Sequence, residues 1–138
     1  MPYIPRNTKH NKQQKGNKPH YVLKPRGLDA CSFGRICLKA STPGKITVNQ
    51  WTAAKNTLNK LLDKKGLLFV SLAFDTPITK KPIAIRMGKG KGLFDHWVCK
   101  VSPGQTIFEI ESKTSLLPVA KRALDVIRIK FPILTRVV

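Results

Sequence analysis

A short stretch near the middle of the chain alternates glycine with lysine, and apolar residues flank it on both sides. The run is Gly88-Lys89-Gly90-Lys91-Gly92. Glycine adopts positive φ at little steric cost, so such a run is typical of a hairpin loop between two strands. A loop that needs only turn geometry more often uses Asn, Asp and Gly. Lys89 and Lys91 therefore indicate a second role, in which the glycines let the backbone approach phosphates and the ammonium groups neutralise them.

A nucleotide-binding loop is the first alternative for this run, and two of its requirements are missing. A Walker A loop needs G-x-x-x-x-G-K-[ST] between a strand and a helix. No Ser or Thr follows Lys91 to bind magnesium, and the segment after it has the pattern of a strand. The dinucleotide-binding pattern G-x-G-x-x-G fails at Leu93. A hairpin that contacts phosphates is therefore favoured over the loop of a nucleotide enzyme.

The net charge of +19, from 26 Lys and Arg against 7 Asp and Glu in 138 residues, limits what the chain binds. Self-repulsion of this size destabilises a compact state unless a partner supplies negative charge. Nucleic acid, an anionic membrane and an acidic protein would each meet that condition. We favour RNA, because the sequence has no helix-turn-helix or zinc-finger pattern for duplex DNA. Arg86 adds a side chain that can form a bidentate contact with phosphate.

The sequence divides into a basic extended arm, residues 1–29, and a single α+β domain, residues 30–138. The arm has no acidic residue before Asp29 and cannot bury enough apolar surface to fold alone. We expect it to become ordered on RNA rather than to remain a solvated tail, and it lacks the apolar helical face of a mitochondrial presequence. Its cations predicted to bind RNA are Arg6, Lys9, Lys12, Lys15, Lys24 and Arg26.

Helical periodicity predicts two helices. The first spans about Val48 to Lys65, opens on a capping box of Thr47 and Gln50, and has Gly66 at the C′ position. Its apolar stripe contains Trp51, Ala54, Leu58, Leu61 and Leu62. The second helix spans about Leu116 to Lys130, with Ser115 as the cap and Pro118 in the first turn. Its predicted apolar side contains Val119, Ala123, Val126, Ile127 and the stem of Lys130.

Apolar runs and alternation between turn residues predict the strands. A turn is expected at Thr42-Pro43-Gly44, and a loop between Pro77 and Pro82. The predicted strands are Ser32–Ala40, a buried Leu67–Phe74, Ile83–Met87, Phe94–Val101, Thr106–Glu111 and an edge strand over Ile133–Val138. Together with the helices they give an α+β fold, two helices packed on a mostly antiparallel sheet in a sandwich.

Catalytic and metal sites are not favoured by the sequence. Cys31, Cys37 and Cys99 have no standard zinc spacing with one another or with the histidines, and are expected to be free thiols. Asp95 and His96 are neighbours in a predicted strand, so they should point to opposite faces and form a poor catalytic pair. We expect no enzyme activity, no cofactor and no metal. The longest apolar run is also far shorter than the roughly 20 residues of a membrane span.

The segment around the glycine run resembles a known protein family. P-I-T-K-K-P-I-A-I-R-M-G-K-G-K-G, followed by W-V, is similar to the signature of the large-subunit ribosomal protein sixteen family, in its bacterial type. S-F-G and L-K-A within Ser32–Ala40, I-T-V-N-Q before the first helix, and K-F-P-I after the second helix fall in the family's order. The resemblance covers about Phe33 to Val137 and is specific because the motif is long.

The resemblance implies a hammerhead-like domain and a structural role on the large ribosomal subunit, near the aminoacyl-tRNA site, in subunit assembly and tRNA accommodation. The implied partners are large-subunit rRNA, tRNA and neighbouring ribosomal proteins, and the alternative is a stand-alone RNA- or nucleotide-binding enzyme. In some bacterial members the arginine that matches Arg86 is hydroxylated. Beyond the arm, the residues expected to bind rRNA or tRNA are Arg35, Lys80, Lys81, Arg86, Met87, Gly88, Lys89, Gly90, Lys91 and Gly92.

The family pattern breaks at Leu93–His96, and the arm matches the bacterial arm only loosely. With frequent Lys, Asn and Ile, this divergence predicts a mitochondrial ribosome, with the bacterial cytoplasm or a plastid ribosome as alternatives.

Overall fold

The computed structural model describes residues 4–5, 7–8, 12–14, 16, 31–63 and 65–138. Five of the six arm cations predicted to bind RNA lie outside these residues, namely Arg6, Lys9, Lys15, Lys24 and Arg26.

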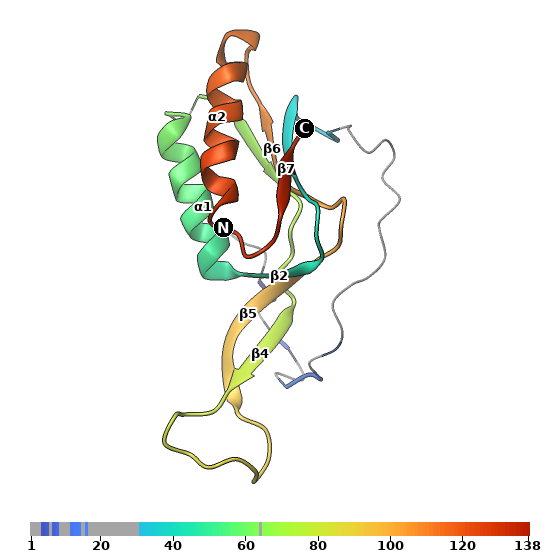
Figure 1. The fold of residues 1–138 in the computed structure, drawn as a ribbon, viewed down its shortest axis with the longest axis vertical. Coiled ribbons are helices and arrows are strands. Elements are labelled where there is room, and N and C mark those ends of the chain that lie inside the picture. Colours follow the sequence, from blue (N-terminus) through green and yellow to red (C-terminus); the bar gives the residue numbers. More distant parts are fainter. Residues whose placement is uncertain (1–3, 6, 9–11, 15, 17–30, 64) are drawn as a thin grey trace.

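The described strands form two antiparallel sheets, with the helices beside one of them (Figure 1). The four-stranded sheet has the order β3 (Leu67–Val70), β6 (Thr106–Glu111), β1 (Ile36–Ala40), β7 (Thr135–Val137). The three-stranded sheet has the order β2 (Gly44–Thr47), β5 (Leu93–Val101), β4 (Thr76–Lys80). The helices are α1 (Val48–Leu61) and α2 (Leu117–Arg128), and a 3₁₀ turn, Thr114–Leu116, precedes α2. The predicted α+β class with two helices on antiparallel sheet is confirmed, and the sheet is divided in two.

The start of α1 follows the prediction, and its end does not. Gln50 N–H donates to Thr47 Oγ1 at 3.3 Å, and Thr47 N–H donates to Gln50 Oε1 at 3.0 Å, which completes the capping box. The helix ends at Leu61, because Asp63 adopts a left-handed conformation with φ 51°. A short polar side chain tolerates that conformation. Gly66 therefore lies beyond the C′ position that the sequence predicted for it.

The apolar side of α2 packs against β1 and β7 of the four-stranded sheet, whereas α1 lies against β2 and β5 and reaches β6 through Trp51. Trp51 is buried between Phe74 and Phe108, with ring centroids 5.9 Å from each. On α2 the buried stripe is Ala120, Ala123, Leu124 and Ile127. The prediction for α2 was wrong for Val119 and Val126, which are 43% and 48% exposed, because the buried positions follow the i, i+3, i+4, i+7 spacing from Ala120. Leu61 of α1 is likewise exposed.

Ser115 does not cap α2, because it lies inside the 3₁₀ turn and Leu116 occupies the N-cap position without a side-chain hydrogen bond. Pro118 does sit in the first turn, as predicted.

Two strand predictions, one loop prediction and one turn prediction were wrong. The run Leu67–Phe74 forms a strand only to Val70, at the sheet edge, where Leu67 is 62% exposed. Residues 76–80, expected in a loop, form β4, which tolerates Pro77 because an edge strand pairs on one side only. Ile83–Met87, expected as a strand, belongs to the loop after β4. Gly44, expected in a turn, begins β2.

Within the part of the chain that the structure describes, no helix is long and apolar enough to cross a membrane. All three cysteines lie in that part, and none of them forms a disulfide.

The buried thiol of Cys99 leads to a prediction about pH. Burial raises the pKa of the Cys99 thiol from 9.0 to about 11, and the Asp75 carboxylate contributes less. Above the ordinary pKa the unfolded chain loses this proton while the folded chain keeps it, so the free energy of unfolding should fall as pH rises from about 9 to about 11. Urea unfolding across this window should show a shallower fall for Cys99→Ala than for wild type. Equal slopes would contradict the assignment.

Candidate nucleic-acid interface

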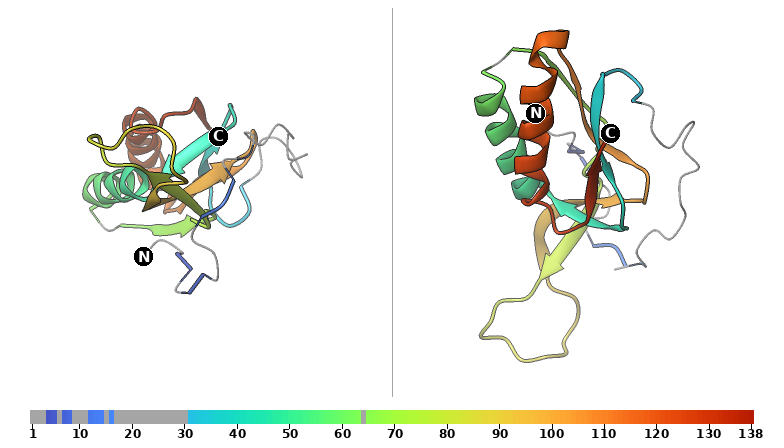
Figure 2. Two further views of the ribbon diagram at one scale, coloured as in Figure 1. Left: turned by 90° about the horizontal axis from the view of Figure 1, so that it is seen from below. Right: turned by 45° about the horizontal axis from the view of Figure 1, so that its top comes forward.

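Strands β4 and β5 form a hairpin that projects from the sandwich, and its loop lies farthest from the helices (Figures 1 and 2). We call this hairpin and its loop, residues 76–101, the finger. The pairing of Lys80 with Leu93 closes the strands, and residues 82–91 of the loop are all exposed. The predicted hairpin loop is therefore present, and it begins earlier than expected because the apolar residues before the glycines are not a strand.

The glycine run supplies the backbone conformations that the loop requires. Gly88 and Gly90 have φ of 96° and 86°, which favour glycine, and Lys89 between them has φ 50°. Lys81 Nζ donates a hydrogen bond across the loop to the Gly88 carbonyl oxygen. Ile85 N–H donates to the Pro82 carbonyl oxygen at 3.2 Å and forms a turn. The run therefore folds as a turn-rich loop that holds Lys89 in solvent.

The loop exposes two large apolar side chains, of which the sequence analysis named Met87 as a binding residue and missed Ile83. Ile83 is 99% exposed and Met87 is 96% exposed, although both were expected in a strand or beside the glycines. Large exposed apolar groups next to cations suit contact with nucleobase faces and riboses as well as with phosphates. The signal available in the sequence was the presence of Pro82 before the apolar run, since proline ends a strand.

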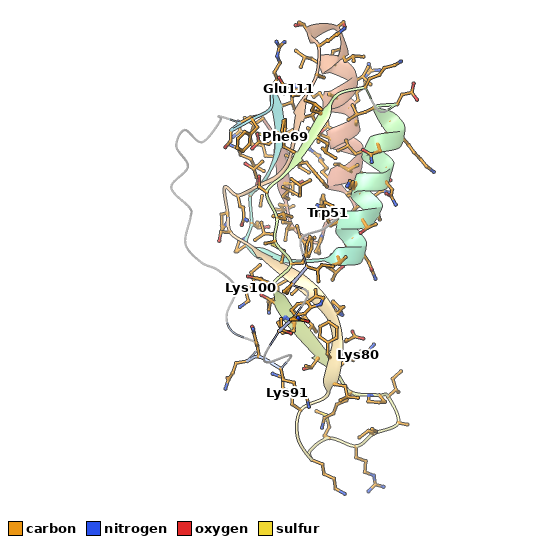
Figure 3. The ribbon with its side chains drawn as sticks, turned by 180° about the vertical axis from the view of Figure 1, so that it is seen from behind. Trp51, Phe69, Lys80, Lys91, Lys100 and Glu111 are labelled. Atoms are coloured by element: carbon orange, nitrogen blue, oxygen red, sulfur yellow. The ribbon has the colours of Figure 1, made fainter. Side chains whose placement is uncertain are left out.

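The finger carries five of the six RNA-binding cations predicted outside the arm. It contains six Lys or Arg residues and a single carboxylate, Asp95. Figure 3 shows Lys100, Lys80 and Lys91 in succession along the finger, from the sandwich toward the loop. Such an excess of one charge creates a positive potential that attracts a polyanion. Lys80, Lys81, Arg86, Lys89 and Lys91 are all brought together here, as the sequence predicted.

The described part of the arm lies against the finger. Lys12 Nζ donates to the Lys91 carbonyl oxygen at 3.4 Å, and Lys91 Nζ donates to the Gln13 carbonyl oxygen. Gly16 lies so close to Lys100 that a Cβ on it would be 3.3 Å from Lys100 Nζ. The described arm residues around Lys12 and the finger therefore form one cationic surface, although 78 positions separate Gln13 from Lys91 in the sequence.

A β-bulge corrects the prediction about Asp95 and His96. Ile78 pairs with His96 and Thr79 pairs with Phe94, so Asp95 is an extra residue in β5. A bulge breaks the alternation of side chains, and Asp95 Oδ2 lies 2.7 Å from His96 Nδ1. The two side chains therefore contact each other rather than pointing to opposite faces. Among the described residues, no group of three His, Cys, Asp or Glu side chains could hold a metal ion.

Arg35 is separate from the predicted RNA-binding residues of the finger. It lies just before β1 and lines a cavity with Glu111, and Figure 3 shows Glu111 at the end of the molecule opposite the finger loop. The sequence analysis named Arg35 as a binding residue without placing it, and the topology puts it at the end of the molecule opposite the finger loop.

Comparison with known proteins places the finger and sandwich in a family. The family model described as ribosomal protein L16p/L10e matches residues 5–138. Two similar relatives are both named large ribosomal subunit protein uL16. The relative from Acinetobacter baylyi is 38% identical over 97% of this chain and 94% of its own length, and the relative from Alkalilimnicola ehrlichii is 41% identical over 95% and 92%. This membership does not favour the alternative of a stand-alone enzyme. The chain belongs to the ribosomal protein L16p/L10e family.

Proposed function

We propose that this chain is a structural constituent of the large ribosomal subunit that binds large-subunit rRNA through the finger and the arm. The observation that carries the proposal is the continuous cationic surface in which Lys12 and Lys91 contact each other. Contact with rRNA phosphates reduces the repulsion among the cations of a chain with net charge +19. The role is that of a binding and assembly protein rather than of a catalyst.

The loop of the finger is the part we propose for contact with tRNA near the aminoacyl-tRNA site. The family resemblance directs the loop there, and its geometry suits the task. Lys89 stands in solvent on a backbone made compact by two glycines, and Met87 beside it is almost fully exposed. Neighbouring ribosomal proteins are the remaining proposed partners, and the exposed Val119 and Val126 of α2 offer them apolar contact area.

We further propose a mitochondrial ribosome as the location of this chain. The support is the divergence at Leu93–His96 within a chain rich in Lys, Asn and Ile. Antibody detection of the chain in fractionated cells tests this point, and its presence in cytoplasmic or plastid ribosomes would contradict it.

Sedimentation tests the proposed function directly. A tagged full-length chain should comigrate with large ribosomal subunits through a sucrose gradient, and release by salt should be steep, because each neutralised phosphate contributes a slope of about −0.9 in log K against log salt. A variant with Lys60 and Lys121, two exposed lysines on the helices, changed to Gln is the matched control and should still comigrate. Recovery of the wild-type chain only in free fractions would refute the proposal.

A further inference from the structure

A cavity of about 740 Å³ lies at the end of the molecule opposite the finger loop. Four segments far apart in the sequence form it: the residue before β1, the start of β3, the end of β6 and the turn before α2. Its volume lies within the range of small-ligand sites, roughly 300–1,000 Å³. The lining includes Arg35, Leu67, Glu111, Ser112, Lys113 and Leu116.

Arg35 is held in place at the wall of the cavity. Its Nη1 donates to Thr114 Oγ1 at 2.9 Å, which fixes the guanidinium across the turn before α2. The backbone behind it is set by Gly34, where a Cβ would lie only 2.8 Å from the Ile110 carbonyl oxygen. Arg35 N–H then donates to that same oxygen at 3.0 Å. A guanidinium with a fixed backbone and one bonded nitrogen keeps its other donors for a bidentate contact to phosphate.

The cationic side chains outnumber the carboxylates at this cavity. Arg35 and Lys113 are joined by Lys65, and Glu111 is the single acidic residue in the lining. Lys65 Nζ lies 3.4 Å from Asp63 Oδ2, so Lys65 is partly neutralised from within the chain. Arg35 and Lys113 therefore make the main positive potential, and an anionic group is the ligand that this end of the cavity would take.

Ser112 is the second observation that points to a ligand. The residue is only 6% exposed, and its buried Oγ has no hydrogen-bond partner among the described residues. A buried hydroxyl without a partner costs about 1–3 kcal/mol. Rotation about a single side-chain bond can turn this hydroxyl toward a ligand in the cavity. A hydroxyl that can donate and accept suits a ribose 2′-OH or the edge of a base.

The apolar part of the lining completes the chemistry. Leu67 is 62% exposed at the start of β3, and Leu116 ends the turn before α2 across the cavity. A flat apolar group can lie against such side chains, whereas a bare phosphate gains nothing from them. A nucleotide has both parts, an anionic phosphate and a flat base, and sequence-specific RNA recognition commonly uses bases that are splayed out of the helix.

We propose that this cavity binds a single unpaired nucleotide of rRNA, with its phosphate on Arg35 and Lys113, its base against Leu67 and Leu116, and Ser112 bonded to the ribose or base. The proposal rests on the rRNA-binding function proposed above and adds a second contact site to it. The chain would then hold rRNA at both ends, by charge at the finger and by an extruded nucleotide at the cavity.

Fluorescence anisotropy with two RNA hairpins tests this site. The hairpins are identical except that one carries a single unpaired nucleotide, and the full-length chain is titrated at about 200 mM salt to suppress contacts made by charge alone. Wild type should bind the bulged hairpin about tenfold more tightly, because only that hairpin offers a base face for burial against Leu67 and Leu116. Arg35→Ala and Lys113→Ala should each reduce the preference to within about twofold. Lys121→Ala, an exposed lysine on α2, is the matched control and should keep it.

Each other outcome overturns the proposal. Equal binding of the two hairpins by wild type removes the nucleotide site, and a preference that survives Arg35→Ala and Lys113→Ala assigns it to another surface. Binding of a free nucleoside monophosphate more tightly than the bulged hairpin would identify a site for free nucleotides instead of RNA. Circular dichroism of each variant checks that it is folded. None of these failures touches the finger, because they leave the salt-dependent comigration with large subunits unchanged.

Discussion

Glu109→Ala is expected to lower the free energy of unfolding by about 3–5 kcal/mol, since each hydrogen bond to a charged acceptor contributes about 1.5–3 kcal/mol. Glu109 is 1% exposed in the middle of β6. Its Oε2 accepts the backbone N–H of Phe33 at 2.6 Å and of Gly34 at 3.0 Å. Removing the carboxylate leaves both donors without this acceptor and leaves a cavity in the sheet.

The variant Glu109→Gln is the first control for this prediction. It keeps an acceptor oxygen at nearly the same position, so it should lose less stability than Glu109→Ala. Glu111→Ala is the second control, because Glu111 lies two residues along the same strand and is exposed. Urea unfolding followed by circular dichroism at neutral pH measures all three. A loss for Glu109→Ala no larger than that for Glu111→Ala would show that the two N–H groups do not depend on the carboxylate.

A consequence for the cavity follows from the same contacts. Phe33 and Gly34 precede Arg35 directly, so the Glu109 carboxylate fixes the backbone that carries the guanidinium. In buffer without urea, and under conditions where both variants are folded, Glu109→Gln should keep the preference for the bulged hairpin better than Glu109→Ala. The buried acid in β6 would then be a positioning residue for Arg35.

The features that the sequence predicts correctly are those that neighbouring residues determine. The capping box of Thr47 and Gln50 and the spacing of Trp51, Ala54 and Leu58 locate α1, because both signals act within a few turns of one helix. The glycine run identifies a loop because positive φ is a property of single residues. The α+β class and the cationic loop of the finger could also be predicted, because they too depend on patterns among neighbouring residues.

The features that the sequence does not predict depend on partners that are distant along the chain. Asp95 enters a bulge only because Ile78 and Thr79 pair on either side of it. The contact between Lys12 and Lys91 joins segments 79 residues apart, and no local pattern records it. The cavity at Arg35 needs four segments to meet. Ile83–Met87 was predicted as a strand because its apolar residues are typical of a buried strand. In the structure these residues are exposed on the loop.

The second large effect is expected in the loop of the finger, where charge can be removed without changing the fold. In the double variant Lys89→Asn, Lys91→Gln, affinity for large-subunit rRNA should fall about ten- to a hundredfold at fixed salt. The slope of log K against log salt should become shallower by about 2, one increment of about 0.9 for each lost phosphate contact. Filter binding of the full-length chain between about 50 and 200 mM salt measures both quantities.

The choice of residues separates charge from conformation. Asparagine accepts the φ of 50° that Lys89 adopts, and is found more often than most residues in that region. Glutamine at position 91 keeps a donor for the Gln13 carbonyl oxygen, which Lys91 contacts now. The free energy of unfolding should therefore stay within about 0.5 kcal/mol of wild type, as is usual for surface substitutions. A loss of stability larger than this would show that the loop supports the fold, and the role proposed for it would be wrong.

Loss of net positive charge alone also weakens binding to RNA, so a control variant that loses the same charge elsewhere is required. Changing Lys60 and Lys121 to Gln removes the same two charges from the exposed sides of α1 and α2. Lys89→Arg keeps the charge of the loop and should bind as wild type does. Every cation adds to the long-range attraction for RNA, but only a cation close to a phosphate also makes a short-range contact. The double variant at Lys89 and Lys91 should therefore lose clearly more affinity than the double variant at Lys60 and Lys121. Equal losses would mean that the finger acts as one part of a diffuse charge and not as the surface that meets the RNA.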